Sequence, residues 1–369
     1  MKRNSIFTAF FAFAVLSFAA CASSTPASQA SAENSSPLTT WQAGAVVTQE
    51  AVEKAGGLDA CFAAEPIPDD VWARMQGKTY KENPYITRAD LRHIRALHWD
   101  YDGAIHTGEM VCNAQIAECV AGIFRKLFDA HYPIQRMLLP DEYDADDETQ
   151  MRDNNSSSFC YRAIAGTTKL SKHARGLAID INTLYNPYYK DRADGTRFIQ
   201  PATAAAYCDR SKDFPYKIVR GDLCYRLFAE AGFEWGGDWG SVKDFQHFEY
   251  VEPEEISALV AQVWDFAKAH PDGFTLDIHS NIEPKAGIAV SYEATQGSHS
   301  KESLEAVIRH ALTHDGYVGG WLNPEDGLYY FDSTKVFDES EREKAVEFGK
   351  ENKQYSAFVL STFEDIILK

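Results

Sequence analysis

One short segment, SKHARGLAIDIN at residues 171–182, constrains the fold of this chain more than any other. Its last six residues alternate apolar side chains with small or polar ones, which predicts a strand with one apolar face. His173 stands seven residues before Asp180, and seven extended residues would span about 23 Å. Gly176 lies between the two and indicates a turn, which would allow the side chains of His173 and Asp180 to face each other.

A second segment, WGGDWGSVKDFQHFEY at residues 235–250, predicts another strand that begins at His247. A catalytic zinc takes three protein ligands and keeps an open position for water. His173, Asp180 and His247 would supply a nitrogen, an oxygen and a nitrogen. Asp244, three residues before His247, would remain as a carboxylate that is free to act as general base.

Together, the two segments closely resemble the VanY-like zinc peptidases. That family contains D-alanyl-D-alanine carboxypeptidases and L-alanyl-D-glutamate endopeptidases of bacterial walls and phage endolysins. Its pattern is S-x-H, six residues, D, and later D or E, two residues, H, and every element is present here. The resemblance covers roughly residues 75–252. It implies a Zn²⁺-dependent peptidase that cleaves peptidoglycan stem peptides, and the form WGGDW…DFQHF favours the endopeptidases over the carboxypeptidases.

The resemblance extends to NNSSSFCYR, which is similar to a family segment whose arginine contacts substrate. That arginine corresponds to Arg162, which would stabilise the carbonyl oxygen or bind a carboxylate. The alternative is a non-catalytic zinc-containing lipoprotein that binds the wall or a partner, because Hedgehog-type signalling domains resemble this fold and keep a zinc site. The presence of both Asp244 and Arg162 favours the enzyme.

The remaining pattern predicts an α+β fold in which a small antiparallel sheet with flanking helices carries the zinc site. Helices are expected over residues 87–98, 113–130 and 224–231. We expect a zinc peptidase domain at 55–255, a connecting helix at 256–274 and a small α+β domain of unknown role at 275–369. Within the last, the pattern predicts helices at 301–314 and 341–352, strands at 287–295 and 356–362, and a hairpin near 327–332.

The N-terminus is typical of an exported lipoprotein. Residues 1–20 carry Lys2 and Arg3 before an apolar stretch that is too short to span a membrane, which predicts a signal peptide. Cys21 follows small residues as in a lipobox and would carry the lipid; the alternative is ordinary signal cleavage near Ala20. Residues 21–54 are then expected to be a disordered tether. The protein would face the wall from the membrane, the outer one in a Gram-negative cell.

The net charge of the chain restricts its possible binding partners. Loss of residues 1–20 would remove two of 36 basic residues and none of 54 acidic ones, so the net charge would change from −18 to −20. Nucleic acid is therefore excluded as a partner.

Six cysteines follow Cys21, which suggests up to three disulfides in an exported chain. Helix geometry argues against a Cys112–Cys119 bridge, since two helical turns separate such residues by about 10 Å.

His310 and His314 have the i, i+4 spacing of zincin motifs, but the glutamate of HExxH is missing. We therefore expect them to be surface histidines without a metal.

Overall fold

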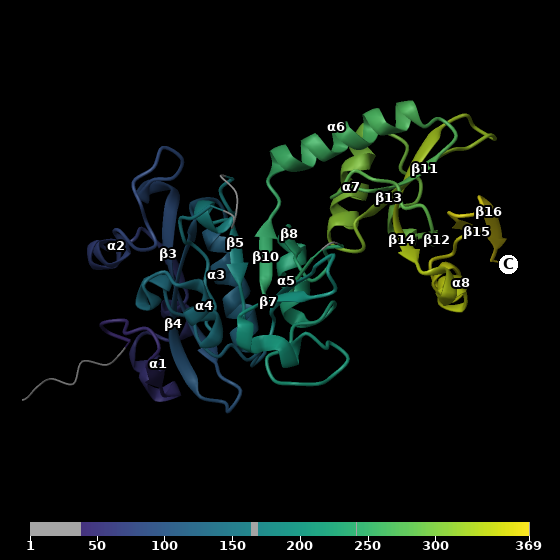
Figure 1. The fold of residues 1–369 in the computed structure, drawn as a ribbon. Coiled ribbons are helices and arrows are strands. Elements are labelled where there is room, and N and C mark those ends of the chain that lie inside the picture. The colour runs from purple at the N-terminus through teal and green to yellow at the C-terminus, as the bar shows by residue number, and fades with distance from the viewer. Residues whose placement is uncertain (1–37, 164–168, 241, 369) are drawn as a thin grey trace, which may run out of the picture. The chain divides into compact units, whose positions relative to one another are not determined.

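The structure is a computed structural model that describes residues 38–163, 169–240 and 242–368. Helices and antiparallel strands alternate along these residues, which confirms the predicted α+β class (Figure 1).

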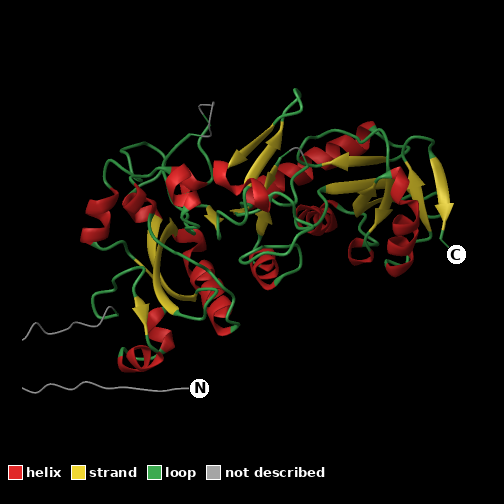
Figure 2. Cartoon of the chain, turned by 60° about the horizontal axis from the view of Figure 1, so that its bottom comes forward, coloured by secondary structure: helices red, strands yellow, loops and turns green. Residues whose placement is uncertain are grey.

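A four-stranded antiparallel sheet begins the fold, in the order β1–β4–β3–β2. Its strands are β1 (Val46–Val47), β2 (Ala63–Glu65), β3 (Leu91–Trp99) and β4 (Ile105–Asn113). Strands β3 and β4 pair along their whole length, and both views show them beside helix α3 (Figure 1, Figure 2).

The prediction of a helix over residues 87–98 is wrong. These residues form a short 3-10 turn at Arg88–Asp90, capped by Thr87, and then enter β3. Leu91, Ile94 and Leu97 recur at every third position, as they would on a helix, but both faces of β3 are covered. Ile94 packs into the main core, whereas Leu97 packs into a separate cluster on the other face. A strand buried on both sides loses the alternation that identifies it in a sequence.

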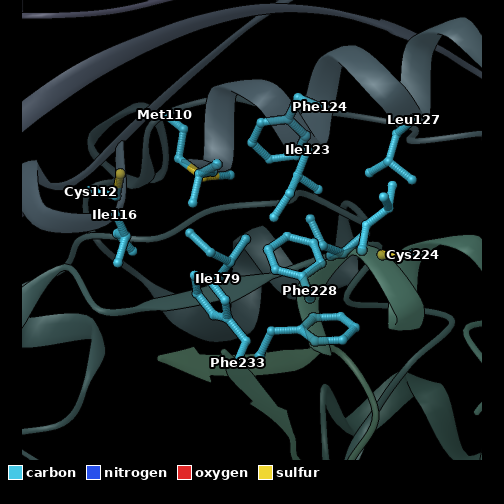
Figure 3. Packing of buried hydrophobic residues seen from close by; sticks show 14 of the residues in the cluster. Met110, Cys112, Ile116, Ile123, Phe124, Leu127, Ile179, Cys224, Phe228 and Phe233 are labelled. Atoms are coloured by element: carbon cyan, nitrogen blue, oxygen red, sulfur yellow. The ribbon is translucent and has the colours of Figure 1, made fainter. Parts of the chain in front are cut away.

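Helix α3 (Ala114–Asp129) confirms the helix expected at 113–130. Asn113 caps it by accepting a hydrogen bond from the backbone N–H of Gln115. Its apolar side packs against strand and helix residues that lie far away in the sequence, including Ile179 and Phe228 (Figure 3). This core fixes the strand that carries Asp180 against the longest helix of the first part of the fold.

Part of the expected tether is ordered, so the prediction of disorder up to residue 54 is wrong. Strand β1 pairs with β4, and helix α1 (Gln49–Lys54) follows it with Thr48 as its cap. Leu38, Val47 and Val52 are buried in a cluster with Phe128. Burial of these apolar side chains orders the segment, although the residues before it are rich in Ser, Ala and Pro.

Two small antiparallel sheets position the site. One has the order β5–β10–β8 and the other the order β7–β6–β9. Their strands are β5 (Ala178–Asp180), β6 (Tyr188–Asp191), β7 (Arg197–Gln200), β8 (Phe233–Trp235), β9 (Lys243–Asp244) and β10 (His247–Tyr250). Helix α5 (Leu223–Glu230) confirms the helix expected at 224–231. Shorter helices are α2 (Asp69–Met75) and α4 (Asp147–Arg152).

The C-terminal part has its own six-stranded sheet, in the order β11–β13–β14–β12–β15–β16. Its strands are β11 (Phe274–Asp277), β12 (Ile288–Ser291), β13 (Tyr317–Leu322), β14 (Tyr329–Phe337), β15 (Ser356–Val359) and β16 (Glu364–Ile367). Its helices are α6 (Pro253–Ala269), α7 (Lys301–Leu312) and α8 (Arg342–Glu351). Each element expected here is found, whereas β11 and β16 were not expected; the domain limits themselves stay predictions.

The expected disulfides are not found. Cys61, Cys112, Cys119, Cys160, Cys208 and Cys224 are all free thiols. Cys112 and Cys224 belong to one core cluster but lie on either side of its labelled side chains (Figure 3). Cys112 is the second-last residue of β4, and α3 begins two residues later. Buried cysteines here fill space as small apolar side chains.

The predicted signal peptide and the predicted lipidation site, Cys21, lie outside the described residues. No helix in the described ranges is both long enough and apolar enough to cross a membrane.

Candidate metal centre

Three side chains from separate parts of the sequence converge at one end of the β5–β10 pair, where β5 ends and β10 begins. His247 stands directly opposite Asp180 in the register of these strands, and His173 precedes β5 in a 3-10 turn. One ligand atom from each of the three lies within 4.8 Å of the others. We call His173, Asp180 and His247 the metal cluster. Among the described residues it is the one group of three or more such side chains with this geometry.

Gly176 turns the chain between His173 and β5, as the sequence predicted. It has φ +68°, a conformation that side chains rarely adopt. A Cβ atom at this position would also lie 2.7 Å from the backbone nitrogen of Asn113. That nitrogen donates to the carbonyl of Gly176 at 2.8 Å, which fastens the turn to the end of β4.

Both histidines have one nitrogen bound to the protein and the other turned toward Asp180. Nδ1–H of His173 donates to the carbonyl oxygen of Ser158 at 2.7 Å, and its Nε2 lies 3.2 Å from Asp180 Oδ2. Nε2–H of His247 donates to Glu249 Oε2 at 3.1 Å, and its Nδ1 lies 3.1 Å from Asp180 Oδ1. Ligand histidines in metalloproteins are oriented by such contacts.

Glu249 is a site residue that the sequence reasoning did not identify. It lies two positions after His247 in β10, and therefore on the same side of the strand. That spacing was the available signal, but a carboxylate on a strand gives no indication of its partner until the fold is known.

Glu234 stands opposite Glu249 in the β8–β10 pair. Burial and the charge of Glu249 raise the pKa of Glu234 to about 8, so Glu234 is a neutral acid near pH 7. Its carboxyl accepts a hydrogen bond from the indole N–H of Trp239. The Trp239 ring is thereby held 5.3 Å, between centroids, from the His247 ring.

The electrostatics of the cluster favour a bound cation. Burial favours the neutral acid, but His173 and His247 hold the pKa of Asp180 well below its usual range. Burial also opposes a charged His247, yet its hydrogen bonds to Asp180 and Glu249 raise the pKa of His247 well above its usual value. The site thus stabilises positive charge between the two imidazoles and the carboxylate, as a metal ion requires.

The donor set fits a catalytic transition metal. Two imidazole nitrogens and one carboxylate oxygen are a ligand combination that zinc takes in hydrolases, leaving a position for water. The non-ligand nitrogen of each histidine already has an acceptor, so neither imidazole must be reoriented.

Asp244 lies at the edge of the site and is not a member of the metal cluster. It ends β9, where it pairs with Tyr188 of β6, and its Oδ1 accepts from the amide of Gln246 at 3.1 Å. Burial raises the pKa of Asp244 to about 6, although the charge of His247 opposes the shift. A carboxylate with this pKa can take up and return a proton near neutral pH.

The two glycines of WGGDW allow β8 to approach Asp244. A Cβ at Gly236 would lie 2.7 Å from the carbonyl oxygen of Asp244, and one at Gly237 would lie 2.4 Å from the Trp235 ring. The Trp235 indole N–H donates to the carbonyl of Phe245 at 2.9 Å. The motif therefore positions Asp244 through backbone packing.

Arg162 borders the loop that carries His173. Its carbonyl accepts from the backbone N–H of Ser171, and its guanidinium forms an ion pair with Asp147 of α4 at 2.7 Å. Nε of Arg162 is buried without a hydrogen-bond partner. The structure places Arg162 beside the loop, while no direct contact joins it to the metal cluster among the interactions of the described residues.

His310 and His314 are half-buried, not at the surface as expected. His310 lies in the last turn of α7, His314 follows the helix by two residues, and their rings stack with centroids 3.6 Å apart. Nδ1 of His310 is hydrogen-bonded to the Ser333 hydroxyl, and Nδ1 of His314 to the carbonyl of His310.

Comparison with known proteins supports the resemblance read from the sequence. Residues 165–250 match the model of a family described as D-alanyl-D-alanine carboxypeptidase, which confirms the VanY-like resemblance for this segment. The match covers under a quarter of the chain but contains the whole metal cluster and Asp244. No curated protein and no solved structure showed significant similarity to the chain.

Proposed function

We propose that this protein is a zinc-dependent peptidase that hydrolyses an amide bond in the stem peptides of peptidoglycan. The observation that carries the proposal is the convergence of His173, Asp180 and His247 within the segment that matches a peptidase family. A carboxylate outside the cluster, Asp244, supplies the proton acceptor that hydrolysis needs.

Each side chain would have a separate role. Nε2 of His173, a carboxylate oxygen of Asp180 and Nδ1 of His247 would hold the ion, while Ser158 and Glu249 keep the two imidazoles oriented. Zinc, when bound, would act as a Lewis acid and make water a better nucleophile at neutral pH. Asp244 would take the proton from the attacking water and return it to the leaving amine.

Arg162 would bind negative charge on the substrate. The Arg162 side chain is 38% exposed, and its ion pair with Asp147 through one nitrogen leaves an N–H donor of the guanidinium for a ligand. A carboxylate of the stem peptide, or the carbonyl oxygen as charge develops, could take this donor.

Two scissile bonds are compatible with this site. The description of the matched family favours the bond between two D-alanines, whereas the form WGGDW…DFQHF favours the bond between L-alanine and D-glutamate. We retain the endopeptidase as the working choice, because the residues around Asp244 resemble that branch more closely.

We also propose that Cys21 anchors the enzyme to a membrane, from which it would reach the wall. A Cys21→Ser variant should move from the membrane fraction to the soluble fraction after cell lysis. Unchanged membrane association would contradict the anchor without affecting the peptidase proposal.

The proposed activity can be tested on soluble muropeptides and purified peptidoglycan, with mass spectrometry of the new termini. Loss of terminal D-alanine identifies a carboxypeptidase, and new D-glutamyl amino termini identify the endopeptidase. Chelation should abolish cleavage and added zinc should restore it. A folded, zinc-loaded protein that releases neither product would favour the non-catalytic alternative.

A further inference from the structure

A small aromatic surface lies at the end of the β13–β14 hairpin, away from the metal cluster in the sequence. Trp321 of β13 pairs directly with Tyr330 of β14, and their rings lie 5.3 Å apart and nearly parallel. His299 lies beside them, with its ring 5.6 Å from that of Tyr330. We call Trp321, Tyr330 and His299 the aromatic platform.

The platform is not part of the core of the C-terminal sheet. Val318 and Phe331 point to the face that α6 and α7 cover, where they are buried. Side chains alternate between faces along a strand, so Trp321 and Tyr330 point to the opposite face. Trp321 is 45% exposed. Tryptophan is enriched at binding interfaces, because its ring combines a large apolar face with a polar N–H.

Two carboxylates hold the rings in place, and the exposed one, Asp326, also offers acceptor capacity to a ligand. The Trp321 indole N–H donates to Asp332 Oδ2 at 3.3 Å, and the Tyr330 hydroxyl donates to Asp326 Oδ2 at 2.8 Å. Asp332 is 8% exposed, and Asp326 is exposed. A carboxylate can accept about four hydrogen bonds, so one such contact leaves capacity for hydroxyl and amide donors.

The chemistry of the platform selects a neutral ligand rich in hydroxyl groups. The acidic residues and the overall charge of −18 disfavour nucleic acids and anionic polymers. A pyranose ring has an apolar face of C–H groups that stacks on an aromatic ring, and hydroxyl groups at its edge that donate to carboxylates. Amino sugars whose amines are acetylated carry no charge and add an amide donor.

We propose that the aromatic platform binds the sugar backbone of peptidoglycan, a β-linked chain of N-acetylated amino sugars. The choice of this particular glycan rests on the proposed function. Binding here would hold the enzyme on the polymer while the metal cluster acts on a stem peptide, and would raise the local concentration of substrate.

A β-1,4-linked tetramer of N-acetylglucosamine tests the platform, because it contains the sugars but no peptide bond of a stem peptide. Titration of the whole protein, followed by calorimetry, should show saturable binding. Trp321→Ala should weaken this binding about tenfold, the upper range for one aromatic stack. Phe363→Ala, which removes an exposed aromatic side chain from the turn between β15 and β16, should leave the affinity unchanged.

Two further measurements keep the result interpretable. Tyr330→Phe removes only the hydroxyl that orients the ring, so it should weaken sugar binding without affecting the melting temperature by more than a surface change does. Trp321→Ala should cleave a soluble peptide substrate at the wild-type rate but bind insoluble peptidoglycan less. Absence of saturable binding to the tetramer, or equal affinity of the wild type and Trp321→Ala, would overturn the proposal and leave a cross-strand pair that only stabilises the hairpin. Sugar binding without stem-peptide cleavage would instead reject the proposed function and retain the platform.

Discussion

The molecule contains two close histidine pairs, His173 with His247 in the metal cluster and His310 with His314 at the end of α7, and their surroundings differ. His173 and His247 come from a turn and a strand, with ring centroids 5.0 Å apart and facing nitrogens 3.2 Å apart. Each carboxylate oxygen of Asp180 contacts one of these two nitrogens. His310 lies in the last turn of α7 and His314 lies two residues after the end of that helix, and their rings stack with centroids 3.6 Å apart.

The difference shows that the surroundings of a histidine pair decide its chemistry more than the spacing of its members. Asp180 and Glu249 raise the pKa of His247, whereas burial and the neighbouring His314 lower the pKa of His310 to about 4. One environment therefore favours positive charge and the other excludes it.

Removal of one cluster histidine should have the largest effect. His247→Ala removes a ligand nitrogen, so zinc content should fall from about one per chain to background, and peptidase activity should fall with it. Elemental analysis of the dialysed protein measures the first and muropeptide release the second. The matched control is His314→Ala, which should retain full zinc content. Loss of zinc in this control would show that the pair of His310 and His314 contributes to metal binding.

Asp244→Asn should separate catalysis from metal binding. The substitution keeps the three cluster residues but removes the proton acceptor, so turnover should fall about a hundredfold or more while zinc content stays unchanged. Steady-state kinetics on a soluble muropeptide, together with metal analysis, gives both quantities. Near wild-type turnover would exclude Asp244 from the mechanism, and zinc loss would make it a contributor to the metal site.

Glu249 should act as a positioning residue, with a smaller effect. Glu249→Ala removes the acceptor for Nε2–H of His247, and zinc affinity should fall about 10–100-fold, the usual scale for such partners. Glu249→Gln keeps an acceptor and should lie between Ala and wild type. Competition with a chelator measures the affinity. Glu254→Gln, an exposed change on α6, is the matched control.

The smallest expected effect concerns the contribution of His310 to the stability of the fold at acid pH. The pKa of His310 is about 4 in the fold and about 6.5 in an unfolded chain. Between these values the unfolded chain binds a proton that the folded His310 excludes, so stability present above about pH 6.5 is lost as the pH falls toward 4. His310→Asn should reduce the drop in melting temperature between pH 7.5 and 5 by about 2–4 °C. An identical drop in both proteins would contradict this.

The sequence predicted the cluster because its members belong to local patterns with fixed consequences. Gly176 could be recognised as a turn, and alternation in the strands around Asp180 and His247 placed both on one side. The orienting contacts were not predictable in this way. Ser158 and Glu234 reach the site only through the tertiary fold, and Glu249, although it shares a strand with His247, has no partner that its position in the sequence alone would identify.

The failures have equally specific reasons. Strand β3 is covered on both faces, so its apolar residues recur with a spacing that is also typical of a helix. Val47 and Val52 are buried and order their segment, although the residues before it have the composition of a tether. The cysteine count suggested disulfides because export was assumed, but count alone does not bring two sulfur atoms together.

X-ray absorption at the zinc edge tests the central claim most directly, because it reports the atoms bound to the ion. The zinc-loaded protein should show a shell of nitrogen and oxygen at about 2.0–2.2 Å with imidazole scattering and no sulfur. His173→Ala should lose this signal. A shell containing sulfur at about 2.3 Å would place the ion on the free cysteines instead and contradict the assignment of His173, Asp180 and His247.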